Sequence, residues 1–142
     1  VFTNMARDFR TSPASSDINL TSESKRKYLA DLKTLSFEFL NALEIENSDL
    51  NDIGKLLHES WSLKKSLNHQ TSNPYIDQLY ETLKKKGMTG GKILGAGGGG
   101  FLLAFAKDPK LKEKIKYELY PNFIALDVKF SSKGTEILWK NF

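Results

Sequence analysis

The sequence predicts an α+β fold in which helices pack against a mainly antiparallel sheet. Up to Gly87 the apolar residues recur at every third or fourth position, which is the period of an amphipathic helix. After Gly87 they form short runs or alternate with polar residues, which is typical of strands. With 142 residues, of which 39% are hydrophobic, the chain is long enough to form one domain with its own core.

Three helices are expected before the period changes. The first covers residues 21–43 and follows a loop-like segment rich in Ser, Asp and Pro. The second runs from about residue 50 to residue 67, and its broad apolar face indicates contact on more than one side. The third begins after Asn73, which can cap it, with Pro74 in the first helical position, and it ends at Gly87 after a basic triplet.

The segments after Gly87 predict a sheet and a fourth helix. Two apolar runs, "KILGA" and "FLLAFA", flank a group of glycines and favour strands. They are followed by a capped helical pattern, "DPKLKEKIKYEL", by the alternating segment "FIALDVKF", and by a turn that predicts a final hairpin. We expect an antiparallel sheet made of the segments near Ile93, Leu103, Leu126 and Ile137, with residues 1–3 as a candidate further strand.

Composition excludes several classes of function. The chain has no cysteine, and its two histidines, His58 and His69, show no ligand spacing, so neither a disulfide nor a metal site made of protein side chains is expected. We expect His58 to be a packed helix residue without a catalytic role. The net charge is +4, but the lysines are dispersed among acidic residues, so no nucleic-acid partner is expected. No apolar run could cross a bilayer and no signal peptide is evident, so we expect a cytoplasmic location without membrane binding.

The segment "GGKILGAGGGGF", residues 90–101, contains seven of the ten glycines. Because glycine is costly to order, this clustering indicates that backbone approaches a ligand or another backbone closely. The spacing satisfies G-x-G-x-x-G, but the following segment is strand-like, and no Lys-Ser or Lys-Thr follows as a P-loop requires. What remains is a connection between two strands, whose successive N–H groups can form a concave anion site. The alternative is a tight turn packed beneath a helix.

The stretch "GGKILGAGGGGFLLAF" resembles the third conserved motif of the GHMP kinases, a superfamily that includes galactokinase, homoserine kinase and mevalonate kinase. The similarity extends upstream through "LLHESWSLKKSLNHQTSNPYIDQLYETLKKKGMTGGKILGAGGGGF" and is to the branch containing the heptose 7-phosphate kinases. The resemblance implies a ferredoxin-like C-terminal domain of an ATP-dependent kinase that phosphorylates a sugar or a sugar phosphate. The implied cofactors are ATP and Mg²⁺, and the implied acceptor is a heptose 7-phosphate.

The resemblance also implies residues that bind the cofactor. They would line the cleft, beside the phosphates of ATP or bracing a loop of the other domain, and they are Gly95, Ala96, Gly97, Gly98, Gly99 and Gly100. No residue is assigned to catalysis. Within residues 97–100, alanine at a position of negative φ is expected to leave the melting temperature near normal while it lowers activity.

Three basic residues are implied as contacts of the substrate. Lys64 and Lys65, beside Trp61 on the second helix, are candidates for the sugar or its phosphate, and the alternative is that both are solvated. The segment "FTNMAR" resembles a "TG-x-x-R" segment that brings an arginine to the sugar phosphate, with Arg7 in that place. Asn4 replaces the expected glycine, and asparagine can adopt the left-handed geometry that preserves the turn.

Two parts of a GHMP kinase are not found in the 142 residues. There is no "GLGSS"-like phosphate loop, and the carboxylate that acts on the acceptor hydroxyl belongs to the same missing half. Residues 1–142 are therefore expected to be the C-terminal domain of a larger kinase, inactive without its N-terminal domain, which would bind most of ATP and Mg²⁺. A non-catalytic small-molecule binding or regulatory module, and an interaction domain that uses the second helix, remain as alternatives.

Overall fold

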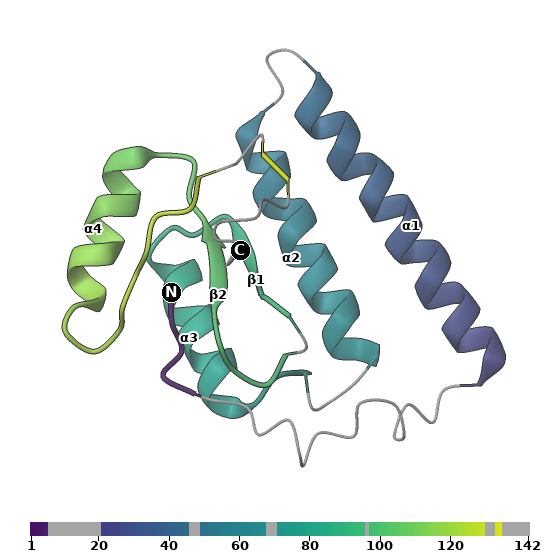
Figure 1. Cartoon of the computed structure of the whole chain (residues 1–142), viewed down its shortest axis with the longest axis horizontal. Helices are drawn as coiled ribbons and strands as arrows, with labels where there is room; N and C mark the ends of the chain where they lie inside the picture. Colours follow the sequence, from purple (N-terminus) through teal and green to yellow (C-terminus); the bar gives the residue numbers. More distant parts are fainter. Residues whose placement is uncertain (6–20, 46–48, 68–70, 96, 130–132, 135–142) are drawn as a thin grey trace, which may run out of the picture.

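The computed structural model describes residues 1–5, 21–45, 49–67, 71–95, 97–129 and 133–134 (Figure 1). The described part contains helices and an antiparallel pair of strands, which confirms the α+β fold. In chain order the elements are α1 (Ser22–Glu44), α2 (Leu50–Leu67), α3 (Pro74–Lys85), β1 (Gly90–Ile93), β2 (Leu102–Phe105) and α4 (Pro109–Leu119). All the predicted helices are present close to their expected bounds. Of the helices in the described ranges, none is long and apolar enough to cross a membrane.

Side-chain caps set the beginnings of three helices. Side-chain oxygens of Thr21, Asn73 and Asp108 each accept a hydrogen bond from an N–H in the first turn, which satisfies a donor that has no partner within the helix. Proline stands in the first turn of α3 and α4, where its missing N–H removes no helical hydrogen bond. α3 ends before Gly87, whose φ of +102° favours glycine.

β1 and β2 form the antiparallel pair that the sequence predicts. Gly90 lies opposite Phe105 and Ile93 lies opposite Leu102, so the glycine-rich connection joins adjacent ends of the two strands. Directly opposed residues share one face of a sheet, and the side chains of Ile93 and Leu102 are both fully buried. This face of the sheet therefore covers the hydrophobic core.

Residues 1–3 extend the sheet on the far side of β2, as expected. Val1 exchanges two hydrogen bonds of 2.8 Å with the backbone of Leu102. On its other side, the N–H of Phe2 donates to the carbonyl of Ile124 over 2.8 Å. With residues 1–3 counted as a strand, the described elements follow the order of a β-α-β-β-α-β ferredoxin-like unit as far as its second helix, α4, with additional helices before β1.

The strand expected near Leu126 is not formed, which corrects the prediction. Within the described residues this segment belongs to no strand, and its backbone link to residues 1–3 is the hydrogen bond at Ile124. Residues 1–3 offer only a short partner, because the chain turns away from this segment at Asn4, whose φ is +57°. The predicted alternation is kept, since Ala125 packs against the core whereas Leu126 is 61% exposed. The strand expected near Ile137 lies outside the described residues.

The core lies between α2, α3, α4 and the sheet. Trp61, on α2, is fully buried in it. In Figure 1, α1 lies along the side of α2 that faces away from β2, and α4 lies beyond β2 at the opposite end of the molecule. The buried members of the core are Trp61, Ile76, Leu79, Tyr80, Leu83, Met88, Ile93, Leu102, Ile115 and Leu119.

Close packing of backbones requires two of the clustered glycines at β1. A Cβ atom added at Gly90 would lie 1.7 Å from the carbonyl oxygen of Gly54 on α2. A Cβ atom added at Gly91 would lie 2.2 Å from the carbonyl oxygen of Leu103 on β2. Neither position has room for a side chain, so glycine here serves the contacts of the strand rather than a ligand.

Candidate functional site

The connection between β1 and β2 is a tight, glycine-rich turn. We call residues 95–100 the glycine segment, and the structure describes all of it except Ala96. The N–H of Leu94 donates to the carbonyl of Phe101 over 2.9 Å, which closes the connection. Four of its members have φ values between +72° and +99°, which side chains rarely adopt, and these are Gly95, Gly97, Gly98 and Gly100.

Two other stretches of backbone hold the glycine segment by hydrogen bonds. The N–H of Gly98 donates to the carbonyl of Thr71, just before α3, over 2.8 Å. The N–H of Gly100 donates to the carbonyl of Met5 over 2.9 Å. Both donors are engaged within the protein, so a bound anion would meet other atoms of the segment.

The same two carbonyls leave no room for side chains on the glycines beside them. A Cβ atom added at Gly97 would lie 2.9 Å from the carbonyl oxygen of Thr71, and one at Gly99 would lie 2.7 Å from that of Met5. Among residues 97–100, Gly99 alone lacks a positive φ. The expectation that alanine at such a position leaves melting near normal is therefore replaced by the prediction that melting falls, because the new methyl group would overlap the backbone of Met5.

Gly95 and Gly100 form the open part of the glycine segment. Apart from the adjacent residues, no atom of the part of the chain that the structure describes lies within 4 Å of the place where a Cβ atom would stand on either residue. The ammonium group of Lys64, on α2, donates a hydrogen bond to the carbonyl of Gly95. The ammonium group can pair with a phosphate of ATP, and the space at these glycines leaves room for it to approach, so this part of the chain fits the implied nucleotide.

The described residues offer no side-chain cluster that could hold Mg²⁺ by itself. They contain no group of three or more His, Cys, Asp or Glu side chains close enough together to hold a metal ion. Magnesium prefers oxygen ligands in octahedral geometry and is commonly held through one or two carboxylates together with substrate phosphates. No step of a mechanism is therefore assigned to Mg²⁺ in this part of the chain.

Lys65 makes different contacts from Lys64. Its ammonium group lies 3.1 Å from Oδ1 of Asp77 and 5.6 Å from the ring centroid of Trp61. Oδ1 of Asp77 also accepts a hydrogen bond of 2.9 Å from the hydroxyl of Ser72. Lys65 is thus joined to the segment before α3, whereas Lys64 is joined to the glycine segment itself.

Asn4 has the left-handed geometry that the sequence predicts for it. Its φ is +57°, and its side-chain Nδ2 donates to the carbonyl of Asn122 over 2.9 Å. Just before it, Thr3 is fully buried and donates both its N–H and its hydroxyl to the carbonyl of Gly100. The turn at Asn4 thereby brings Met5 to the glycine segment. Arg7, two positions further along, lies outside the described residues, so its role stays a prediction.

His58 is a packed helix residue, as expected. Its Nδ1 lies 2.7 Å from the hydroxyl of Tyr80, which in turn donates to the carbonyl of Gly91 over 3.3 Å. Burial lowers the pKa of His58, and the nearby charge of Lys84 lowers it further. Burial raises the pKa of Tyr80 to about 12. The pair therefore links α2, α3 and β1 in neutral form at neutral pH.

Three residues of the site were missed in the sequence. Met5 and Thr71 act through their backbone carbonyls, which leave no signal in side-chain type. Asp77 was not singled out, because an acidic residue in the first turn of a helix is explained by the helix dipole alone. Its contact with Lys65 of α2 exists only in the folded chain, so the sequence does not indicate it.

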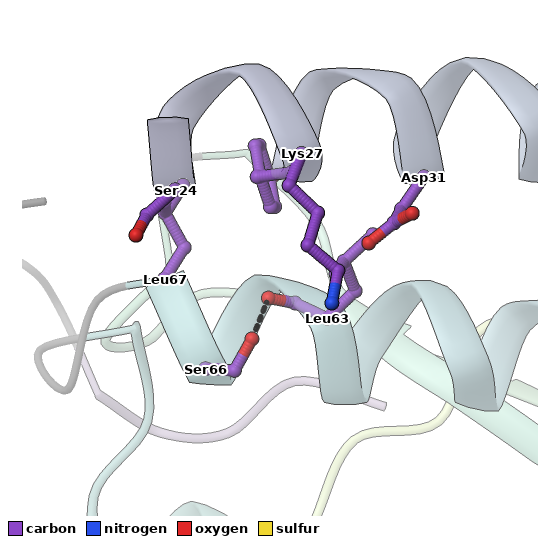
Figure 2. Close-up of a pocket in the computed structure, with 7 residues that line it drawn as sticks. Ser24, Lys27, Asp31, Leu63, Ser66 and Leu67 are labelled. Carbon is purple, nitrogen blue, oxygen red and sulfur yellow. Dashed lines mark hydrogen bonds between the residues drawn. The ribbon is translucent and has the colours of Figure 1, made fainter. Parts of the chain in front are cut away.

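A separate cleft lies between α1 and α2 (Figure 2). It has a volume of about 300 Å³ and contains none of the residues that the sequence predicts for the site. Figure 2 shows Lys27 reaching from α1 toward α2, and the hydroxyl of Ser66 donating to the carbonyl of Leu63 over 2.8 Å. The lining residues are Ser24, Lys27, Tyr28, Asp31, Leu63, Ser66 and Leu67.

Curated relatives of the chain are sugar kinases by name. It is 34% identical over 73 residues to a bifunctional fucokinase/GDP-fucose pyrophosphorylase of Arabidopsis thaliana, which covers 51% of this chain and 7% of the relative. It is 29% identical over 127 residues to the L-fucokinase/L-fucose-1-P guanylyltransferase of Bacteroides fragilis, covering 86% and 13%. It is 27% identical over 144 residues to the D-glycero-alpha-D-manno-heptose 7-phosphate kinase of Campylobacter jejuni, covering 95% and 39%. The chain thus spans less than half the length of each of these relatives.

A solved structure and a protein family also match. The structure of L. major mevalonate kinase in complex with R-mevalonate covers 68% of this chain and 31% of its own, with a TM-score of 0.49 and 20% identity. The family described as "GHMP kinases C terminal" matches residues 41–125, which include α2, α3, the glycine segment and α4. Since this match covers more than half of the sequence, the chain belongs to the GHMP kinase C-terminal family.

Proposed function

We propose that residues 1–142 are the C-terminal domain of an ATP-dependent sugar kinase, which transfers the γ-phosphoryl group of ATP to a sugar or a sugar phosphate. The observation that carries the proposal is the open space at Gly95 and Gly100, together with the ammonium group of Lys64 at the carbonyl of Gly95. The family of the chain and the kinase names of its relatives support it. A cytoplasmic location belongs to the same proposal.

The proposed role of the glycine segment is to position phosphate. Phosphoryl transfer depends mainly on positioning the reacting groups and on neutralising the charge of the transferred group. In this proposal the phosphates of ATP bind at residues 95–100, the predicted Ala96 included, and Lys64, which donates to the carbonyl of Gly95, supplies a positive charge there. Most of ATP, and its Mg²⁺, is bound by the N-terminal domain of the same protein. When bound, ATP supplies the phosphoryl group.

For the acceptor we propose a sugar phosphate, with a heptose 7-phosphate first. The Campylobacter jejuni relative is named for that substrate, and its alignment covers most of this chain and a larger share of its own length than the other two do. The two other relatives are named for fucose. Arg7, which follows the turn at Asn4, is the proposed contact for the sugar phosphate. L-Fucose is the competing acceptor, because two of the relatives are named for fucose. It differs from a heptose 7-phosphate in having no phosphate for this arginine to bind.

The experiment uses the longest protein that contains this chain. It is incubated with ATP and Mg²⁺ and with either heptose 7-phosphate or L-fucose, and the release of ADP is followed. We expect turnover with heptose 7-phosphate, and a loss of about tenfold or more in kcat/KM when Gly100 is replaced by alanine. The new methyl group would stand in open space, where the phosphate is proposed to approach.

Gly134→Ala is the matched control for that variant. It adds the same methyl group at a position without a positive φ, where the described residues other than its neighbours leave open space. The melting temperature of each protein is measured alongside, because alanine at the φ of +83° of Gly100 is also strained. Absence of turnover with every sugar would refute the kinase, and full activity of Gly100→Ala would refute the phosphate contact.

A further inference from the structure

The position of the glycine segment depends on the backbone of Thr71. The carbonyl of Thr71 accepts the N–H of Gly98 over 2.8 Å, and its Cα would lie 3.0 Å from a Cβ atom at Gly97. Thr71 is only 3% exposed, so it has little freedom to move. Any displacement of residues 71–73, which we call the corner before α3, is therefore passed directly to the glycine segment.

An ion pair from α2 fixes this corner. Oδ1 of Asp77 accepts a hydrogen bond from the hydroxyl of Ser72 over 2.9 Å and lies 3.1 Å from Nζ of Lys65. Asn73 caps α3 by accepting the N–H of Ile76 over 3.0 Å. The carboxylate of Asp77 thus joins the corner to α2 through one oxygen atom.

The contacts of Lys65 hold its charge at this place. The ammonium group lies over the ring of Trp61, which is fully buried and therefore a rigid support. If Lys65 moved away to bind a substrate phosphate, Asp77 would lose its cationic partner and the corner would lose its link to α2. Lys64, by contrast, already touches the glycine segment at the carbonyl of Gly95.

We infer that Lys65 and Asp77 are positioning residues of the phosphate site: the ion pair holds the corner before α3, and the corner holds the glycine segment through Thr71. Lys65 then acts on the reaction through Asp77 and does not touch the substrate. The inference deepens the proposed function. Only its kinetic part rests on that function, because only the kinetic part requires kinase activity. Its structural part concerns the described residues and can be measured without activity.

The structural part is tested by hydrogen exchange in the longest protein that contains the chain. Peptides covering residues 94–101 are followed by mass spectrometry in Lys65→Met, Asp77→Asn and Lys65→Arg. We expect Lys65→Met and Asp77→Asn to speed exchange in these peptides by about two- to fivefold, as suits an ion pair that is about 40% exposed, and Lys65→Arg to restore protection. Lys27→Met, a lysine of the α1–α2 cleft, is the control and should change nothing in these peptides.

The kinetic part separates positioning from direct binding by a double-mutant cycle. If Lys65 acts through Asp77, the double variant of Lys65→Met and Asp77→Asn loses no more kcat/KM than the more damaging single variant. Additive losses, confined to the KM of the sugar phosphate, would instead show that Lys65 binds the substrate and would overturn the inference. Unchanged exchange in both single variants would overturn it as well. A protein without turnover on any sugar would refute the proposed function but leave the exchange result to decide the structural part.

Discussion

Replacing Gly99 with alanine adds one methyl group where the backbone of residue 5 already lies. The added carbon would stand 2.7 Å from the carbonyl oxygen of Met5 and 3.2 Å from its Cβ atom. Carbon and oxygen atoms that are not bonded do not approach so closely, so either the glycine segment or residues 3–5 must shift. The nearest atom belongs to the backbone, which cannot rotate out of the way as a side chain can.

The cost follows from the kind of strain. Overpacking by a methyl group that forces a backbone shift costs about 1–3 kcal/mol of unfolding free energy, which lowers the melting temperature of a domain of this size by about 3–10 °C. Backbone strain adds nothing here, since Gly99 lacks a positive φ. The shift would also lengthen the hydrogen bond between Gly100 and Met5, which is 2.9 Å long.

The assay is thermal and urea unfolding of Gly99→Ala beside Gly134→Ala. At the control position no atom of the described residues lies within 4 Å of the new methyl group, its chain neighbours aside, so alanine there is expected to be neutral or to stabilise by about 0.4–1 kcal/mol. If Gly99→Ala has the same melting temperature as the wild type, Met5 does not approach the glycine segment closely. The explanation of why residue 99 is glycine then fails.

Three further predictions follow from other contacts. Gly90→Ala should cost about 3 kcal/mol or more by urea unfolding, because its methyl group would lie 1.7 Å from the carbonyl oxygen of Gly54; unfolding at the wild-type urea concentration would contradict this. Asn4→Ala should cost about 1–2 kcal/mol because of the φ of +57°, whereas Asn4→Gly should cost a few tenths; equal losses would mean that the turn does not matter. Burial holds the pKa of His58 below 6.5, so the unfolded chain takes up this proton first as the pH falls. Stabilisation by His58 is therefore present above pH 6.5 and is lost as the pH falls through the folded-state pKa, and His58→Gln should flatten the fall in unfolding free energy between about pH 7 and pH 5.

The helices could be predicted because their signals are local. Periodic apolar residues, the caps Thr21, Asn73 and Asp108, and the terminating Gly87 all lie within or beside the helix that they define. The left-handed geometry of Asn4 was expected from the resemblance, which places glycine at this position, and from the ability of asparagine to adopt the same geometry. These features depend little on the rest of the fold.

The partners of the site residues could not be predicted, because they are set by contacts between distant parts of the chain. Nothing in the residue types at Met5 and Thr71 shows that their carbonyls accept the amides of the glycine segment. The strand expected near Leu126 failed for a related reason, since an alternating segment forms a strand only beside a partner of sufficient length. Lys64 and Lys65 are adjacent in sequence, yet the fold gives them different partners.

The clustering of glycines has more than one physical cause. Gly90 and Gly91 are required by packing at β1, whereas Gly97 and Gly99 are required by the carbonyls of residues 71 and 5. The N–H groups of Gly98 and Gly100 are engaged by those same carbonyls, so a cradle built from successive free amides is not what this turn offers. Gly95 and Gly100 remain with open space where a side chain would stand, and the ammonium group of Lys64 lies at the carbonyl of Gly95. The G-x-G-x-x-G spacing therefore arises here from separate demands on separate residues, and the proposed contact with phosphate depends on Gly95, Gly100 and Lys64 rather than on the motif as a unit.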